Sequence, residues 1–189
     1  MSIEDGVAAT RRRLTGRRAE TVTKLTTALP VVLREVGYQD LTLQRVAEES
    51  GLARATAYIY FSSKDHLIAE VYWRQLNSLE MIQSDSDSPA DRVVAVLRSL
   101  AMLFEGEPEY AEAVSVALLG TDSDVIELRS QIAREIRRRI RTAVGETDDP
   151  AVVDLVELIY TGAMTRAGTG HVSFAEAADV MEAGVRRIL

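Results

Sequence analysis

Apolar residues recur along most of the chain with the three- and four-residue spacing of an amphipathic α-helix. The spacing runs from Val93 to Phe104 and again from Val125 to Val144. Alternation of apolar and polar residues, which is typical of half-buried strands, is not sustained over any comparable stretch. The pattern therefore predicts an all-α protein.

Residues 41–67, LTLQRVAEESGLARATAYIYFSSKDHL, predict two short helices separated by a tight turn. Thr42 is suited to cap the first helix, because its hydroxyl can accept an unpaired backbone N–H. Gly51 can adopt the positive φ that ends this helix, and a second helix begins at about Ala53. The small residues Ala47 and Ala57 allow the two helices to approach closely. This spacing is typical of a helix-turn-helix.

Polar side chains on the second helix suit contacts with base edges and phosphates. They belong to Arg54, Thr56, Tyr58 and Tyr60. In the following SSKDHL segment, Ser62 is placed to cap a third helix, with Asp65 completing a capping box. Lys64 stands beside the N–H groups of that helix end, an arrangement that binds phosphate. We expect His66 to face solvent or a phosphate.

Residues 34–67 resemble the N-terminal signature of TetR-family transcriptional regulators. The matching positions are Gly37, Tyr38, Thr42, Ala47, Gly51, Thr56, Tyr58, Tyr60, Phe61, Lys64 and Leu67. The resemblance implies DNA-binding helices near 18–36, 43–50 and 54–60, and a long helix from about 64 to 83 that links them to an α-helical ligand-binding and dimerisation domain. We expect a basic, flexible arm over 1–17, a helix-turn-helix domain over 18–63 and a regulatory domain over 64–189.

By position, the resemblance also implies which residues face a double-stranded DNA operator. They are Thr42, Gln44, Arg54, Ala55, Thr56, Tyr58, Tyr60 and Lys64. Arg54 and Gln44 are the candidates for base readout. The chain departs from the family pattern at Pro30, which lies inside the first helix and can kink it. Alanines at 53 and 55, and Arg45 at a capping-box position, affect specificity more than fold.

The net charge of −7 is unevenly distributed. Residues 1–83 carry 11 basic and 10 acidic side chains, whereas residues 84–189 carry 11 and 19. The acidity of the second part opposes DNA contact, and the first part is left nearly neutral. An arginine-rich stretch at residues 11–18 either reaches phosphates or a minor groove, or forms a solubilising tail.

The regulatory half contains no motif that identifies an effector. Large or adaptable side chains are candidates for a small-molecule pocket, although core packing explains each one as well: Trp73, Leu76, Met102, Phe104, Tyr110, Tyr160 and Met164. Two helices near 149–167 and 173–188 have wide apolar faces, which predict a homodimer closed by a four-helix bundle. The residues on these faces are Val152, Val153, Val156, Ile159, Ala163, Ala178, Met181, Val185 and Ile188.

Other function classes find little support. The chain has no cysteine, no P-loop and no Ser/His/Asp arrangement, so we expect neither an enzyme nor a metal or cofactor site. It has no signal-peptide core and no bilayer-length apolar run, which predicts a cytoplasmic protein without membrane contact. Two alternatives to a ligand-released repressor stay open. One is a regulator of this fold with a protein effector or none, and the other is a helical scaffold with a vestigial DNA-binding head.

Overall fold

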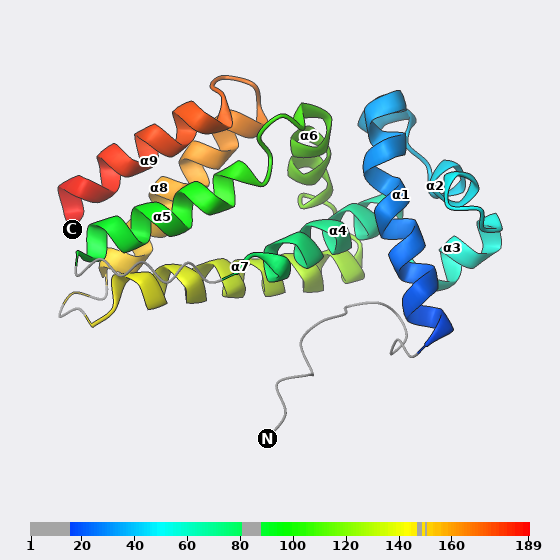
Figure 1. The fold of residues 1–189 in the computed structure, drawn as a ribbon, viewed down its shortest axis with the longest axis horizontal. Coiled ribbons are helices and arrows are strands. Elements are labelled where there is room, and N and C mark those ends of the chain that lie inside the picture. The colour runs from blue at the N-terminus through cyan, green and yellow to red at the C-terminus, as the bar shows by residue number, and fades with distance from the viewer. Residues whose placement is uncertain (1–15, 81–87, 147–148, 150) are drawn as a thin grey trace. The chain divides into compact units, whose positions relative to one another are not determined.

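A computed structural model describes residues 16–80, 88–146, 149 and 151–189. Every regular element in these ranges is an α-helix (Figure 1), as the sequence predicts. The helices are α1 (Arg17–Asp40), α2 (Leu43–Glu49), α3 (Arg54–Tyr60), α4 (Lys64–Ser78), α5 (Pro89–Met102), α6 (Pro108–Ala117), α7 (Ser123–Val144), α8 (Ala151–Gly168) and α9 (Phe174–Ile188). None of them has the length and apolar character that crossing a membrane requires.

The helices form two compact units that are not continuous in sequence. The first unit contains residues up to Asn77 together with Glu109–Gln131, and the second contains Ser78–Pro108 and Ile132–Leu189. Helix α7 therefore begins in the first unit and ends in the second. The predicted domain boundary at residue 63 lies inside the first unit.

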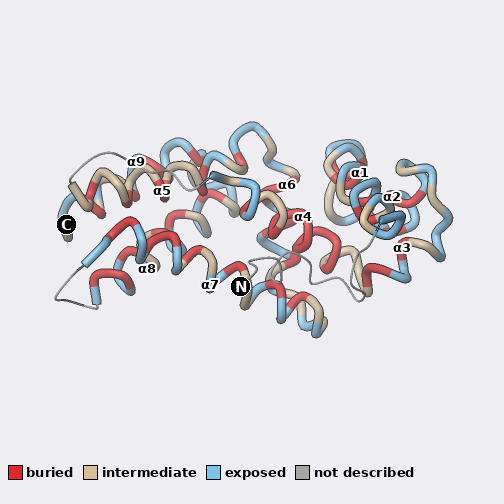
Figure 2. The backbone as a smooth tube through the Cα atoms, turned by 60° about the horizontal axis from the view of Figure 1, so that its bottom comes forward, coloured by how far each residue is buried: buried red, intermediate tan, exposed pale blue. Residues whose placement is uncertain are grey.

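In the first unit, α2 packs against both α1 and α3. The core residues of these helices include Leu25 and Leu29 of α1, Val46 and Ala47 of α2, and Ala57 of α3, all fully buried. In Figure 2 the buried stretches alternate with exposed ones along the same helices. This alternation is the outcome of the apolar spacing in the sequence, which leaves the other faces of α2 and α3 open to solvent.

Helix α1 passes through Pro30, and its irregular residue is Gly37 instead. Gly37 has φ 68° and ψ 173°, a conformation that is essentially restricted to glycine. The regular part of α1 therefore ends at residue 36, where the helix was predicted to end.

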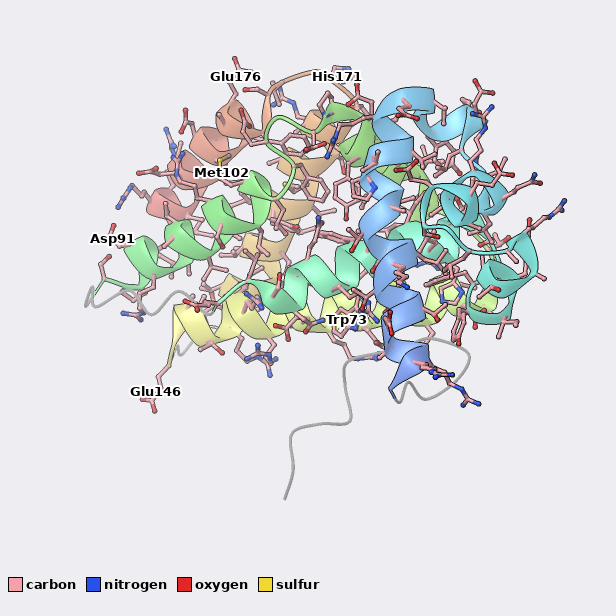
Figure 3. All side chains as sticks on the ribbon, turned by 45° about the vertical axis from the view of Figure 1, so that its right-hand side comes forward. Trp73, Asp91, Met102, Glu146, His171 and Glu176 are labelled. Atoms are coloured by element: carbon pink, nitrogen blue, oxygen red, sulfur yellow. The ribbon has the colours of Figure 1, made fainter. Side chains whose placement is uncertain are left out.

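In the second unit, α9 packs against both α5 and α8. Gly184 of α9 gives the close approach to α8, because a Cβ placed there would lie 3.1 Å from Ile159. Ion pairs join the other side of α9 to α5, among them Arg98 with Asp179 at 2.8 Å. A capping box of Ser173 and Glu176 fixes the start of α9, and Glu176 is labelled in Figure 3.

The predicted helices in the second half correspond to α5, α7, α8 and α9 within a few residues at their ends. Two elements differ from the prediction. The long helix expected from residue 64 to about 83 ends at Ser78, and α6 was not predicted. Its ten residues carry apolar side chains around much of the helix, so the sequence shows little amphipathic contrast there.

Candidate nucleic-acid interface

The turn between α2 and α3 has the geometry that the sequence predicts. The Thr42 hydroxyl accepts a hydrogen bond from the backbone N–H of Arg45 at 3.2 Å and so caps α2. Gly51 has φ 69°, and the next residue, Leu52, donates its N–H to the Ala47 carbonyl at 2.8 Å. Ala47 and Ala57 are fully buried where the two helices meet. These contacts fix the direction in which α3 leaves the turn.

The two candidates for base readout contact each other across this turn. Arg54 of α3 donates from Nη1 to Gln44 Oε1 of α2 at 3.3 Å, and Gln44 Nε2 donates to Glu48 Oε1 at 2.9 Å. The Arg54 guanidinium also lies 5.5 Å from the centre of the Tyr58 ring. All four side chains are on the surface. The arginine is therefore held on an exposed face that combines residues from both helices.

The predicted DNA-facing residues are not equally accessible. Thr42, Gln44, Arg54, Ala55 and Tyr58 are exposed, and Thr56 and Lys64 are half-buried. Tyr60 differs, because it is only 7% exposed and belongs to the core. Its assignment as a DNA-facing residue is therefore not supported by its position. The helical turn places Tyr60 three residues after Ala57, on the buried side of α3.

The start of α4 corrects a second prediction. Ser63, and not Ser62, caps this helix, because its hydroxyl accepts the backbone N–H of His66 at 3.0 Å. Lys64 donates from Nζ to the Tyr38 carbonyl at 2.7 Å, and its ammonium lies 4.1 Å from the centre of the Tyr38 ring. This ammonium therefore occupies the carbonyl end of α1, where a positive charge is favourable.

Tyr38 is tied to the same region through its side chain. Its hydroxyl donates to Asp65 Oδ1 at 2.8 Å. Burial, the hydrogen bond to Asp65 and the charge of that carboxylate together raise the pKa of Tyr38 to about 12. The end of α1 is thus anchored to the first turn of α4 by Tyr38 and Lys64.

His66 lies in the interior, contrary to the expectation that it faces solvent or a phosphate. It is fully buried, its ring meets Phe61 edge to face at 5.1 Å, and its Nδ1 lies 3.4 Å from Asp124 Oδ2. The nearby Ser62 hydroxyl donates to Asp122 Oδ2 at 2.6 Å. No local sequence pattern predicts this cluster, because its acidic members lie almost sixty residues further along the chain.

Asp122 is stabilised as a carboxylate by this arrangement. Burial raises its pKa, but hydrogen bonds from Ser62, the Asp124 backbone and Ser63, with the charge of His66, outweigh burial and lower it overall. The segment that follows α3 and the segment that precedes α7 are therefore joined inside the first unit by charge-assisted hydrogen bonds.

Side chains proposed for a ligand pocket divide between the two units. Trp73, Leu76 and Tyr110 belong to the first, and Met102, Phe104, Tyr160 and Met164 belong to the second (Figure 3 labels Trp73 and Met102). Most are buried, as ordinary core residues are, and Phe104 stacks on Phe174 at 5.3 Å. Met102 is 37% exposed.

Two buried polar atoms on α4 stand out from this core packing. Glu70 is fully buried and Trp73 nearly so, and neither Glu70 Oε2 nor Trp73 Nε1 has a hydrogen-bond partner in the described part of the chain. The other carboxylate oxygen of Glu70 accepts from Arg74 at 2.8 Å. Burial raises the pKa of Glu70, although the charge and hydrogen bond of Arg74 oppose the rise.

The apolar faces predicted for dimer contacts are used inside the chain. Seven of the nine predicted residues are buried in the second unit, and only Ile159 and Ile188 are partly accessible. The large apolar residues that remain exposed on α8 and α9 are Leu155 at 45%, Leu158 at 69% and Val180 at 49%. The prediction of the dimer face was therefore wrong, because these apolar side chains belong to the packing of α9 against α8 and α5 within one chain.

The capped first helix, the glycine turn and the exposed Arg54 and Tyr58 of the second helix define a DNA-binding protein of the helix-turn-helix class. Residues 28–71 match the family model described as bacterial regulatory proteins, tetR family. A helix-turn-helix transcriptional regulator of Mycobacterium tuberculosis is 41% identical over 165 residues, which cover 86% of this chain and 78% of that protein. The chain belongs to the TetR family and is a transcriptional regulator, not an enzyme.

A more distant relative and two solved structures are also similar to this chain. The transcriptional repressor KstR of Rhodococcus jostii is 23% identical over 159 residues, covering 81% of this chain and 75% of the repressor. A crystal structure of a TetR transcriptional regulator from Rhodococcus sp. RHA1 matches the fold with a TM-score of 0.74 at 21% identity, over 92% of this chain and 98% of that one. A TetR regulator from Haloarcula marismortui matches with a TM-score of 0.64 at 22% identity, over 90% and 95% of the two chains.

Proposed function

We propose that this protein is a homodimeric repressor that binds a near-palindromic operator through α2 and α3 and is released by a small-molecule effector. The observation that carries the DNA-binding part is the exposed Arg54–Gln44 contact, which presents a guanidinium and an amide side by side. Arginine pairs with the O6 and N7 atoms of guanine, and glutamine pairs with adenine in the same groove. Thr56 and Tyr58 complete the proposed surface through phosphate contacts, whereas the Thr42 hydroxyl and the Lys64 ammonium already bind groups within the domain.

The dimer part of the proposal places two copies of the second unit in contact through α8 and α9. Leu155, Leu158 and Val180 form the apolar part of this surface, and α8 and α9 are held close together where Gly184 meets Ile159. Exposed apolar side chains on two adjacent helices suit the centre of a four-helix bundle. A two-fold axis would then repeat the reading helix, so the operator would contain two inverted half-sites about 34–36 Å, or a multiple of this, apart.

Support for an effector comes from the buried polar atoms of α4. A buried carboxylate oxygen and an indole N–H without partners are uncommon in folded proteins, because each loses its hydrogen bonds to water. Glu70 and Trp73 are one helical turn apart and so lie on the same side of α4. An effector with one hydrogen-bond donor and one acceptor would satisfy both atoms.

Release requires that the effector favour a state that binds the operator poorly. The proposed route is the cluster of His66, Ser62, Asp122 and Asp124, which joins the end of the reading helix to the start of α7. A shift of either segment changes these hydrogen bonds. Helix α4 carries both Glu70 and His66, so it is the element through which the effector would act.

The experiment that tests this function selects duplexes from a random-sequence DNA library with the purified protein. We expect the recovered sequences to share an inverted repeat. Arg54→Ala and Tyr58→Ala should each lose the selected sequence, because both residues lie on the proposed reading face. Arg141→Ala, which removes an exposed arginine of α7, should retain it. Recovery of unrelated sequences by the unaltered protein would contradict the proposal.

A further inference from the structure

Ile59 is an apolar side chain on the exposed face of α3. It is 50% exposed, although isoleucine is among the residues most often buried in proteins. Single exposed apolar residues elsewhere on a surface carry little information. Ile59 differs because it shares a seven-residue helix with Arg54 and Tyr58, the two side chains assigned above to DNA.

The helical geometry places Ile59 on the side of α3 that faces away from the core of α1, α2 and α3. Ala57 is fully buried and marks the inner side of the helix. At 100° per residue, positions 55 and 59 each fall about 160° from it. Ala55 is exposed as well. The outermost strip of α3 therefore consists of a methyl group and an isoleucine, with Tyr58 and Arg54 along one side of it and Thr56 along the other.

The outward face of the second helix of a helix-turn-helix enters the major groove. Thymine is the base that presents a methyl group there, and the other bases present donors and acceptors. Isoleucine has neither donor nor acceptor, so it would remove water from a polar base edge without replacing the lost hydrogen bonds. Ala55 is small enough to let the backbone approach the same base pair.

We infer that Ile59, with Ala55 beside it, recognises the 5-methyl group of a thymine in each operator half-site. This inference rests on the proposed function, because it requires α3 to be the reading helix. It adds a specificity residue of a different chemistry to the arginine and glutamine, one that discriminates by apolar contact.

The test replaces each thymine of the selected inverted repeat, one position at a time, with deoxyuridine. This change removes only the methyl group and leaves every hydrogen-bonding group of the base pair in place. At one position the unaltered protein should lose about fourfold in affinity per substituted half-site, which corresponds to the ~0.8 kcal/mol of one buried methylene-sized group. Ile59→Val should keep this sensitivity, because it retains a branched apolar tip.

Ile59→Ala should bind the thymine and deoxyuridine duplexes equally. Ile126→Ala removes an isoleucine that is 42% exposed on α7. Like the unaltered protein, this control variant should lose about fourfold in affinity when the thymine is replaced with deoxyuridine. The inference is overturned if no thymine position is sensitive, or if Ile59→Ala retains the sensitivity. It is also overturned if Ile59→Ala changes the oligomeric state instead of the thymine dependence. If the library yields no inverted repeat at all, the proposed function itself fails, and that result is seen before any deoxyuridine is introduced.

Discussion

At the scale of single residues, two groups of side chains can be distinguished in the head, which is formed by α1–α4. One group holds these helices together, and the other lies on the exposed face proposed to bind DNA. Thr42 has its hydroxyl in a cap, and Lys64 and Tyr38 tie α1 to α4. Arg54 and Tyr58 have only surface contacts with their neighbours. Substitutions in the first group should change stability, and substitutions in the second should change DNA binding.

Replacing Thr42 with alanine should lower the free energy of unfolding of the first unit by about 1 kcal/mol, because an N–H of α2 loses its cap. Trp73 is the single tryptophan and lies in this unit, so its fluorescence in urea follows the transition. Thr42→Ser keeps the hydroxyl and should be close to the unaltered protein. Thr23→Ala, on an exposed face of α1, is the control and should cost nothing. Equal stability of Thr42→Ala and Thr23→Ala would contradict the capping role.

Glu70 should make the stability of the first unit depend on pH. Burial raises its pKa above the ordinary value of 4.5, so the folded state holds the proton more tightly than the unfolded chain. The stability contributed by the protonated carboxyl is complete below 4.5 and is lost as the pH rises through the raised pKa. Glu70→Gln should therefore be at least as stable as the unaltered protein at pH 7, and this advantage should disappear near pH 4.

Asp122→Asn supplies the opposite case in the same unit. The pKa of Asp122 is lowered below its ordinary value of 3.8, so its contribution is present above that pH and is lost as the pH falls through the lowered pKa. The variant should be less stable than the unaltered protein at pH 7. Urea titrations of both variants and of the unaltered protein at several pH values, followed by Trp73 fluorescence, measure how each residue's contribution to the free energy of unfolding changes with pH. If both contributions changed with pH in the same direction, the opposite pKa shifts of Glu70 and Asp122 would be contradicted.

At the scale of helices, α8 and α9 each have apolar side chains outside the face that packs within the chain. The larger face is buried inside the chain and the smaller one, around Leu158, remains exposed. Periodicity identifies both helices but does not distinguish a core within one chain from a contact between two chains, because both bury the same kinds of side chain.

Leu158→Glu should convert the dimer to monomers, since a carboxylate would be buried at the proposed two-fold contact. The control is Leu119→Glu, in which the leucine is even more exposed, at 78%, but lies in the first unit. Sedimentation of the two variants across a range of concentrations makes the comparison. A monomeric Leu119→Glu with an intact Leu158→Glu dimer would place the interface elsewhere.

The local elements of the head were predictable from sequence, and the contacts between distant segments were not. Thr42, Gly51 and the two alanines act over ten or fewer residues, so their spacing alone specifies the turn. The choice between Ser62 and Ser63 as a cap differs by one residue, which is finer than a pattern can decide. The burial of His66 depends on Asp124, whose proximity arises only on folding. The helical spacing alone places Ile59 on the side of α3 opposite Ala57, but only the structure shows that this side is exposed.

At the scale of the whole molecule, the distribution of charge limits how the protein attracts DNA. The chain has a net charge of −7, and residues 1–83 are nearly neutral. Bulk attraction to the phosphate backbone is therefore weak, and binding must come from a few placed cations and hydrogen-bond donors. We expect modest affinity for arbitrary DNA, and a large part of the operator affinity to come from base contacts.

The most direct measurement of this account is the ratio of affinities for the selected inverted repeat and for a scrambled duplex of the same composition, at one fixed salt concentration. Fluorescence anisotropy of labelled duplexes provides both values. The account predicts a ratio of about 10³ or more for the unaltered protein, in the range of specific DNA-binding proteins, and a ratio near one for Arg54→Ala. A ratio near one for the unaltered protein, or an undiminished ratio for Arg54→Ala, would contradict the assignment of α2 and α3 as the reading surface.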